Sequence, residues 1–280
     1  MQNIWITGAA GRVGTALKKA LDCTQYRVLA TDAAEVDVAD LKGVHAYMYR
    51  NRPDIVINCA GLTDLEACNA NPDKAYLINA LGARNLAQES NAIGAEIIHI
   101  STDDIFGASN EPKNEFDPPA PRSVYGKSKL AGERLVSELN DRHVILRSSW
   151  VYGSGTDFVS TLLHQAQQGN IIAVPGDQFG SPTSAAELAA VILDFIENEN
   201  YGVYHAVCKG SCSRYEFAQE ILNRCGLAEQ VTLQRTTGGT GGRPDSAVLD
   251  TMMLRLSHMR EPAAWQEALA VYLTALGVAR

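Results

Sequence analysis

The chain has 280 residues, of which 46% are hydrophobic and 20% are charged, so it is long enough for one large domain with a smaller appended lobe. The net charge is −8 and the acidic residues are scattered, which argues against a nucleic-acid partner because neutralising phosphates requires clustered Lys and Arg. No apolar run reaches the roughly 18–20 residues that cross a bilayer, and the first strand leaves no room for a signal peptide. We therefore expect a cytoplasmic protein with no membrane partner.

The first half of the chain alternates short apolar strands with helical segments. Strands are expected at 4–7, 27–31, 54–58, 97–100 and 144–146, and helices over about 12–21, 44–50, 72–91 and 123–139, with a loop over 101–122. This alternation is typical of βαβ crossovers and predicts a Rossmann-like, doubly wound α/β fold with a parallel sheet. Residues 1–150 are thus predicted to form a dinucleotide-binding domain.

After Trp150, glycine and proline punctuate shorter elements. Helices are expected near 157–168, 184–197, 213–224 and 262–276. Residues 151–280 are predicted to form a smaller, mixed α/β substrate lobe, from which segment 201–206 could return to the main sheet as a late strand. The glycine run at 238–242 is either a flexible lid or plain turn punctuation.

Two residue types that often carry metal or disulfide chemistry are dispersed. The six cysteines include no CxxC pair, and without a secretory signal they are expected to be reduced thiols. The six histidines include no pair at i, i+3 or i, i+4, which predicts no histidine metal site, and His99 in an apolar strand is interpreted as a core residue.

A glycine-rich motif, Gly8-Ala-Ala-Gly11-Arg12-Val13-Gly14, lies between the first strand and the first helix. In this pattern the first glycine permits a tight turn, the second lets backbone approach a pyrophosphate, and the third lets the helix pack on the strand. The start of the helix then presents N–H groups to the diphosphate. The motif predicts a dinucleotide site without any basic patch.

Asp32 ends the second strand, where a carboxylate can bind the adenosine ribose hydroxyls and would repel a 2′-phosphate. Ala33 and Ala34 follow, so no cation stands next to it. The sequence therefore favours NADH, and Arg12, expected near the adenosine end, keeps NADPH as the alternative. Further cofactor contacts are expected at the adenine and at the end of the third strand: Asp37, Val38, Cys59, Ala60 and Gly61.

Tyr125 and Lys129 lie four residues apart in a helical segment and so project from one face. A nearby ammonium stabilises tyrosinate and lowers the Tyr pKa, which lets the phenol protonate a carbonyl oxygen as hydride reaches its carbon. Thr102 ends a preceding strand and can donate a hydrogen bond to the same oxygen. These three residues are the predicted catalytic set.

Together with the glycine motif, Ser101-Thr102-Asp103 and Tyr125-Gly-Lys-Ser-Lys129 resemble the extended short-chain dehydrogenase/reductases, and most of all the dTDP-4-dehydrorhamnose reductase family. The likeness spans nearly the whole chain. It continues through 79–87, 125–133, 146–153, 177–183, Arg243-Pro244 and Leu249-Asp250.

The resemblance implies a Rossmann-like fold and NAD(P)H-dependent reduction of the 4-keto group of a nucleotide-activated 6-deoxyhexose, as in deoxysugar and polysaccharide biosynthesis. It implies that Thr102, Tyr125 and Lys129 are catalytic and that Asp103 and Trp150 contact the sugar. Tyr125 and Lys129 are also expected to contact the cofactor, Lys129 at the nicotinamide ribose. Other substrate contacts are expected from Asp104, Phe106, Phe179 and Arg243. The planar guanidinium of Arg243 suits a diphosphate. The expected partners are the nucleotide sugar and a second copy in a homodimer.

One position departs from the reductase pattern, since Asp104 stands where such reductases usually carry an aromatic residue. Thr102-Asp103-Asp104 partly resembles the Thr-Asp-Glu of sugar-nucleotide 4,6-dehydratases, so a dehydratase or epimerase is an alternative. Asp104 could equally be a solvated loop carboxylate. A third reading, of a different class, is a non-catalytic NAD(P)-binding regulatory subunit, although all three catalytic residues are present.

Overall fold

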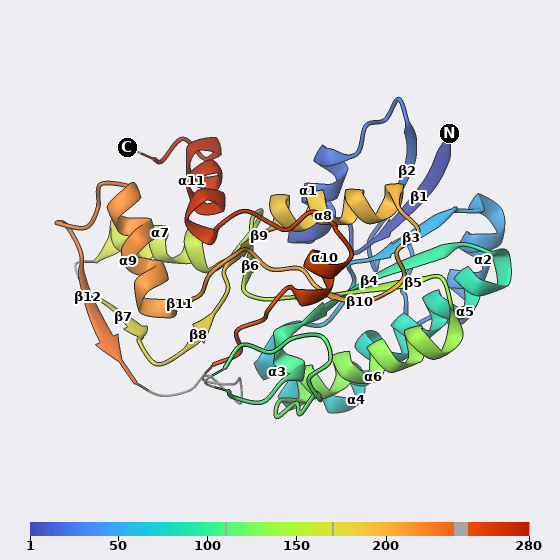
Figure 1. Cartoon of the computed structure of the whole chain (residues 1–280), viewed down its shortest axis with the longest axis horizontal. Helices are drawn as coiled ribbons and strands as arrows, with labels where there is room; N and C mark the ends of the chain where they lie inside the picture. The colour runs from blue at the N-terminus through green and yellow to red at the C-terminus, as the bar shows by residue number, and fades with distance from the viewer. Residues whose placement is uncertain (110, 170, 238–245, 280) are drawn as a thin grey trace.

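The computed structural model describes residues 1–109, 111–169, 171–237 and 246–279. Within these residues, six parallel strands form the central sheet (Figure 1). In spatial order they are β2 (Tyr26–Thr31), β1 (Gln2–Thr7), β3 (Ile55–Asn58), β4 (Glu96–Thr102), β5 (His143–Ser148) and β10 (Gly202–His205). The chain leaves β1 to β2 on one side and continues to β3 on the other, which brings the carboxyl ends of β1 and β3 together.

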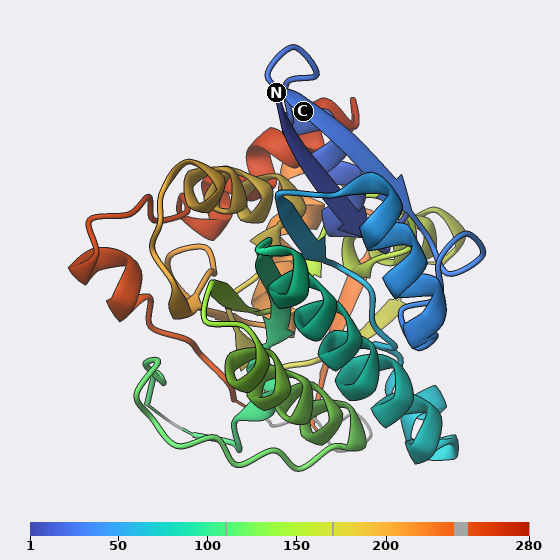
Figure 2. The same ribbon diagram turned by 90° about the vertical axis from the view of Figure 1, so that its right-hand side faces the viewer.

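Helices cover both faces of this sheet. On one face, α1 (Arg12–Ala20) and α8 (Ala185–Glu197) pack on alternate strand residues such as Ile4 and Ile6. On the other face, where Trp5 points, lie α2 (Leu41–Asn51), α5 (Ala83–Ile93) and α6 (Val124–Leu139), and Figure 2 shows α5 and α6 side by side. The structure therefore confirms the predicted doubly wound α/β fold with a parallel sheet.

The single helix predicted over 72–91 is interrupted in the structure. After α3 (Leu65–Ala70), it divides into α4 (Pro72–Tyr76), a π-helical turn η1 (Leu77–Gly82) and α5. The Asn79 side chain within this π-turn hydrogen-bonds to two segments distant in sequence, the backbone of Leu62 and the hydroxyl of Ser128. Such a π-turn is often associated with a functional site.

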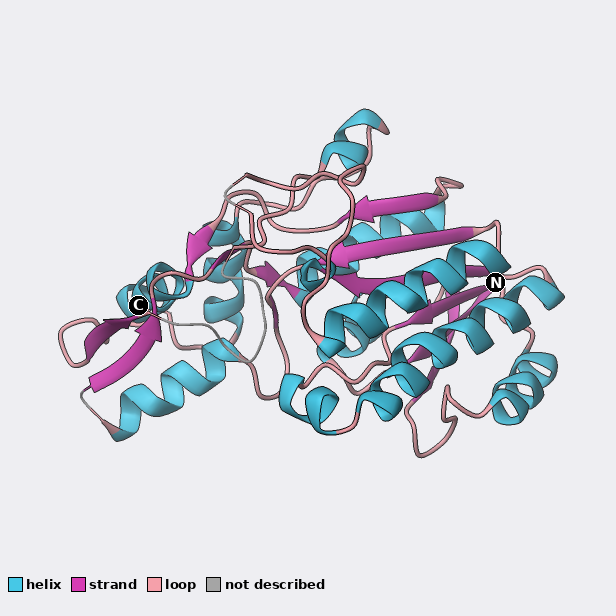
Figure 3. Ribbon diagram, turned by 90° about the horizontal axis from the view of Figure 1, so that it is seen from below, coloured by secondary structure: helices cyan, strands magenta, loops and turns pink. Residues whose placement is uncertain are grey.

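A second part of the molecule lies beyond the carboxyl ends of the strands (Figures 1 and 3). Its core gathers Tyr152, Phe217 and Trp265 among other apolar residues. Its helices are α7 (Phe158–Gln168), α9 (Arg214–Arg224) and α11 (Trp265–Ala275). Its paired strands are β7 (Ile171–Pro175) with β12 (Thr232–Thr236), β8 (Phe179–Gly180) with β11 (Cys212–Ser213), and β6 (Val151–Tyr152) with β9 (Thr183–Ser184).

Packing crosses residue 150, the predicted boundary between the two parts. Helix α8 and α10 (Met252–Leu256) pack on the large sheet, and segment 201–206 contributes β10, which pairs in parallel with β5. The division into 1–150 and 151–280 stays a prediction. The six cysteines are free thiols. Among the residues described, no helix is both long and apolar enough to cross a membrane.

Candidate active site

The turn between β1 and α1 requires its glycines. Gly8 has a φ of +63°, and a Cβ there would lie 2.8 Å from the backbone of Ala60. A Cβ on Gly14 would lie 2.7 Å from the Gly8 carbonyl oxygen. The Gly11 N–H donates to that same oxygen at 3.0 Å and closes the turn. The loop, the start of α1 and the end of β3 can approach one another this closely only because these side chains are absent.

The start of α1 fits the diphosphate of a dinucleotide. Gly11 is the N-cap residue and provides no side-chain cap, and the first turn of the helix has no acidic residue. The N–H groups of Arg12, Val13 and Gly14 have no acceptor within the helix, and the positive end of the helix dipole lies there. This glycine cradle and the uncapped helix start are consistent with the predicted cofactor-binding residues.

Asp32 lies beside this cradle, after the end of β2. Its two carboxylate oxygens accept from the Ala10 N–H at 3.0 and 3.1 Å. The carboxylate is therefore held at the glycine turn, where an adenosine ribose would be expected. Arg12 extends in another direction, since its Nη2 donates to the carbonyl oxygen of Thr156 at 2.6 Å, in the loop before α7.

The two residues expected near the adenine differ in their surroundings. The Asp37 carboxylate accepts from the Ala39 N–H within a turn. Val38 is buried, and its side chain packs so closely on Gly82 that a Cβ there would lie 2.7 Å from Val38 Cγ2. The backbone oxygen of Val38 accepts from the amide of Asn85 on α5.

Cys59, Ala60 and Gly61 follow β3 and run past the glycine cradle. Asn79 fixes the end of this segment, because its Oδ1 accepts from Leu62 N at 2.8 Å and its Nδ2 donates to Leu62 O at 3.0 Å. The same Nδ2 lies 2.9 Å from Ser128 Oγ on α6. Asn79 therefore links the predicted cofactor loop to the predicted catalytic helix. The sequence pointed to Asn79 only as part of segment 79–87, one of the segments that resemble the reductase family.

Thr102 ends β4 and is followed by a short 3-10 turn, η2 (Asp103–Ile105). The Thr102 hydroxyl donates to Asp103 Oδ1 at 3.1 Å and accepts from the Asp104 N–H at 3.2 Å. Ser149 donates to the other carboxylate oxygen of Asp103 at 2.6 Å. Asp104 is only 4% exposed, so the reading of it as a solvated loop carboxylate is wrong.

Tyr125 and Lys129 are both buried and lie one turn apart on α6. Ser123 caps the start of this helix by accepting from the Gly126 N–H at 2.9 Å. Gly126 lies so close to the carbonyl oxygen of Asp104 that a Cβ would have no room. The Tyr125 end of α6 thus packs directly on the turn that follows Thr102, which brings the three predicted catalytic residues onto adjoining elements.

The amine of Lys129 lies behind this turn and is buried. Its Nζ donates to Ile100 O at 2.6 Å and lies 3.4 Å from His99 Nε2. Burial lowers the pKa of Lys129 to about 8, and the charge of Glu133 opposes that shift. Burial in turn raises the pKa of the Cys59 thiol to about 12, so this neighbour is protonated near neutral pH.

A buried ion pair joins α6 to the sheet one turn beyond Lys129. Glu133 accepts from Arg147 Nη2 at 2.9 Å and from its Nε at 3.2 Å, and both side chains are nearly inaccessible. The guanidinium of Arg147 also stacks 5.4 Å from the centre of the Phe106 ring. Phe106, expected to line the substrate pocket, is buried against Arg147 and His205. No sequence pattern links Glu133 to Arg147, which lie 14 positions apart on a helix and a strand.

Trp150 follows β5 with a φ of +46°, a left-handed conformation that is rare for a large residue. Its indole lies against Gly180, where a Cβ would be 2.8 Å from the Trp150 Nε1. The guanidinium of Arg214 stacks 3.5 Å from the centre of the indole ring. Phe179 is 38% exposed on the neighbouring strand β8. Arg243, which was also expected to contact the substrate, lies outside the described residues.

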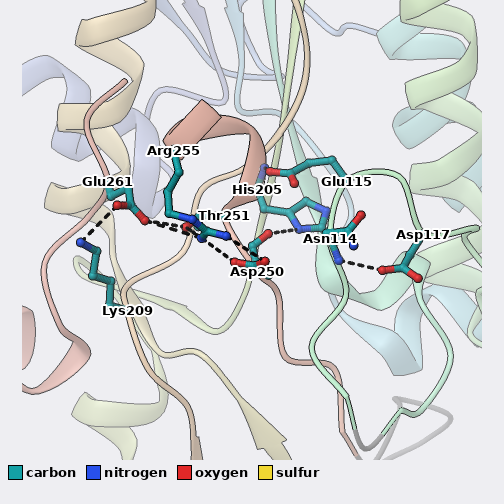
Figure 4. A network of polar contacts seen from close by, with 9 residues as sticks. All are labelled: Asn114, Glu115, Asp117, His205, Lys209, Asp250, Thr251, Arg255 and Glu261. Carbon is teal, nitrogen blue, oxygen red and sulfur yellow. Dashed lines mark hydrogen bonds and ion pairs between the residues drawn. The ribbon is translucent and has the colours of Figure 1, made fainter. Parts of the chain in front are cut away.

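A polar network ties the loop after η2 to the C-terminal segment (Figure 4). Glu115 accepts from the backbone N–H of His205 at 2.9 Å. The Nδ1 of His205 lies 2.9 Å from the carbonyl oxygen of Asp250, whose carboxylate pairs with Arg255 at 2.6 Å. Burial and the charge of Arg147 lower the pKa of His205 to about 3, so this histidine is a neutral structural link. Within the described part of the chain, no group of three or more His, Cys, Asp or Glu side chains could hold a metal ion.

Comparison with known proteins identifies the family. The family model described as the RmlD substrate binding domain matches residues 1–278. The spore coat polysaccharide biosynthesis protein SpsK of Bacillus subtilis (strain 168) is 39% identical over 98% of this chain and 97% of its own length.

Two solved structures are similarly close. A dTDP-4-dehydrorhamnose reductase from Clostridium acetobutylicum ATCC 824 has a TM-score of 0.96 at 39% identity, covering 99% of this chain and 100% of its own. The dTDP-4-dehydrorhamnose reductase of Bacillus anthracis str. Ames, in complex with NADP, has a TM-score of 0.95 at 35% identity, covering 98% and 99%. The chain belongs to the RmlD substrate binding domain family, which confirms the resemblance to the dTDP-4-dehydrorhamnose reductases.

Proposed function

We propose that this protein is an NAD(P)H-dependent oxidoreductase that reduces the 4-keto group of a nucleotide-activated 6-deoxyhexose. The observation that carries this proposal is the joint presence of the glycine cradle at β1 and the adjoining Thr102, Tyr125 and Lys129. Relatives named dTDP-4-dehydrorhamnose reductase point to dTDP-4-dehydrorhamnose as the first substrate to test.

A reduced nicotinamide held at the glycine cradle would supply the hydride that C4 of the sugar receives. The Tyr125 hydroxyl gives its proton to the ketone oxygen, and Thr102 donates a hydrogen bond to that oxygen as negative charge develops. In its protonated form, Lys129 favours the tyrosinate that remains. In the structure the single Thr102 hydroxyl proton is donated to Asp103 Oδ1, so in the reaction it has to turn from this carboxylate to the ketone oxygen. Asp103 stays held by Ser149 through its other oxygen and then offers an acceptor for a sugar hydroxyl.

NADH is the proposed preference. The Asp32 carboxylate at the glycine turn would repel a 2′-phosphate, and Arg12 is engaged with Thr156. The Bacillus anthracis relative is a complex with NADP, so both cofactors belong in the assay. A higher kcat/KM with NADPH than with NADH would overturn the preference and leave the reductase proposal intact.

The stoichiometry of cofactor consumption separates the proposed reduction from the alternatives. A reductase consumes one NAD(P)H per product, whereas a 4,6-dehydratase or epimerase returns its cofactor to the starting state and consumes none. The dehydratase is the second candidate because Asp104 is buried next to Thr102, where an acidic pair could move protons. A panel of nucleotide-linked keto sugars and the parent hexoses, followed at 340 nm and by product analysis, distinguishes them.

If no sugar nucleotide in the panel is converted but NADH binds, the non-catalytic regulatory subunit becomes the better account. We further propose that residues 1–150 hold most of the cofactor, that 151–280 supply most of the substrate lobe, and that the protein is a cytoplasmic homodimer. Light scattering of the purified protein measures its mass in solution. A homodimer should have twice the chain mass of 30.2 kDa, and a mass of one chain would contradict the proposed dimer.

A further inference from the structure

Three buried polar residues lie side by side across the sheet, behind the catalytic helix. Thr7 on β1 is the register partner of Asn58 on β3, and Asn58 is the partner of His99 on β4. Their side chains share the face on which α6 packs, because each lies two residues beyond a residue of that face's apolar core. All three are 2% exposed or less. Lys129 on α6 is next to His99.

The orientation of the Asn58 amide is fixed by a backbone donor. Its Oδ1 lies 3.1 Å from the N–H of Ala60, which can only donate, and 3.0 Å from the Thr7 hydroxyl. The amide oxygen must therefore face Ala60, and the Nδ2 group faces His99 Nδ1 at 3.0 Å. Since Nδ2 can only donate, Nδ1 of His99 must accept.

This contact determines where the proton of His99 resides. Burial and the neighbouring Lys129 hold the pKa of His99 well below its usual range, so the ring is neutral and carries one N–H. With Nδ1 as the acceptor, that N–H is at Nε2, which lies 3.4 Å from Lys129 Nζ. The Nε2–H of His99 on β4 therefore lies next to the Lys129 amine on α6.

We propose that Asn58 and His99 are positioning residues that set the protonation state of Lys129, with His99 held as the Nε2–H tautomer that donates to the unprotonated amine. A neutral amine has one lone pair, which can accept from Nε2–H while an amine N–H donates to Ile100 O. An ammonium has no lone pair, so the Nε2–H of His99 and an N–H of Lys129 would be two donors facing each other without an acceptor. The contact therefore stabilises the amine relative to the ammonium.

Other ionisable groups act on the same amine from the elements packed around it. Glu133 on α6 favours the ammonium, whereas burial favours the amine. Cys59 after β3 is protonated near neutral pH and adds no charge there. Tyr125 lies one turn away on α6. Within the proposed reductase function, on which this consequence rests, the His99 contact helps to place proton loss from Lys129 within the working pH range. The tautomer itself does not depend on that function.

Nitrogen-15 NMR of protein labelled at histidine tests the tautomer directly. The Nδ1 and Nε2 shifts distinguish the two neutral tautomers and the imidazolium, and the His99 signals are assigned by their loss in His99→Gln. We expect the Nε2–H form from pH 6 upward. The Nε2 chemical shift should show one inflection, near the Lys129 pKa of about 8, as the amine loses its proton. An Nδ1–H tautomer, or a protonated ring between pH 6 and 7.5, would overturn the proposal.

The substitution Asn58→Asp tests the link to Lys129. A carboxylate still accepts from Ala60 and Thr7, but it cannot donate to His99, so the histidine proton moves to Nδ1 and Nε2 accepts from the ammonium. The alkaline limb of kcat/KM for the reduction should then move up by about one pH unit or more. If NMR shows the Nδ1–H tautomer and the limb stays in place, Lys129 is not controlled by this contact.

Thr7→Val is the matched control. It removes one contact to Asn58 Oδ1 but leaves the Ala60 N–H that orients the amide. We expect the Nε2–H tautomer and the position of the alkaline limb to stay unchanged, and a change in either would refute the orientation argument. If the protein is not a reductase, no pH profile of kcat/KM can be measured. The NMR shifts of His99 need no turnover, so they test the tautomer independently of the proposed function.

Discussion

The buried pair of Glu133 and Arg147 joins helix α6 to the sheet, and its loss should lower the free energy of unfolding. In Glu133→Gln the neutral amide keeps an acceptor for one of the Arg147 N–H groups, but it leaves a buried guanidinium without its counter-charge. Both side chains are under a tenth exposed, so solvent compensates little. We expect the free energy of unfolding to fall by about 3 kcal/mol, near the lower end of the range for breaking a buried pair.

Urea unfolding followed by circular dichroism measures this loss, and an exposed pair supplies the control. Glu220 and Arg224 form an ion pair whose side chains are about a third exposed, so Glu220→Gln should cost under about 1 kcal/mol. Replacing both buried partners by apolar residues, in Glu133→Leu with Arg147→Met, should recover much of the loss because no charge is left unpaired. A Glu133→Gln variant as stable as Glu220→Gln would refute this reasoning.

The same substitution has an effect at the active site. Glu133 raises the pKa of Lys129, so removing its charge should lower that pKa below its present value of about 8. The alkaline limb of the pH profile should therefore move down in Glu133→Gln, opposite to its movement in Asn58→Asp. Movement in the same direction for both variants would contradict the assignment of the limb to Lys129.

Three further outcomes are expected. Asp32→Ser should lower the ratio of kcat/KM for NADH over NADPH by about tenfold, since it removes the charge that repels a 2′-phosphate, and an unchanged ratio would show that Asp32 does not select the cofactor. Gly14→Ala should weaken NADH binding in a fluorescence titration, because its Cβ would lie 2.7 Å from Gly8 O, whereas Gly169→Ala, with nothing within 4 Å, should not. Burial lowers the pKa of Lys129 from 10.5 to about 8 in the folded protein. Between these two pH values the unfolded chain binds more protons than the folded protein. The Lys129 contribution to the free energy of unfolding therefore rises with pH over this range. Lys129→Met should remove that term, and an unchanged pH dependence in chemical unfolding would contradict the buried amine.

The layers of the fold could be predicted because they follow from local sequence patterns, namely strand alternation and helical spacing. Alternation in Ile4-Trp5-Ile6 sends neighbouring side chains to opposite faces of the sheet, and the structure has them in separate core clusters. The spacing of Tyr125 and Lys129 put both on one side of a helix, and both are buried there. Periodicity and spacing were sufficient in these cases because each contact involves one element and its nearest neighbours.

Contacts between distant segments could not be predicted in this way. The π-turn at Asn79 depends on the Leu62 backbone and Ser128, and helical periodicity through 72–91 contains no sign of either. The burial of Asp104 depends on α6 packing on its turn, although the sequence around it reads as a loop. Likewise, His99 was interpreted as a core residue, but its relation to Lys129 requires the register of three strands.

The reaction of Tyr125→Phe with a dTDP-linked 4-keto-6-deoxyhexose and NADH tests the central claim most directly. The variant removes one hydroxyl, so NADH should bind as it does to the wild-type protein. Turnover should fall by at least about a hundredfold, as expected when a general acid is lost. A Tyr125→Phe variant that binds NADH normally and keeps near-wild-type turnover would contradict the assignment of Tyr125 as the proton donor, and with it the proposed mechanism.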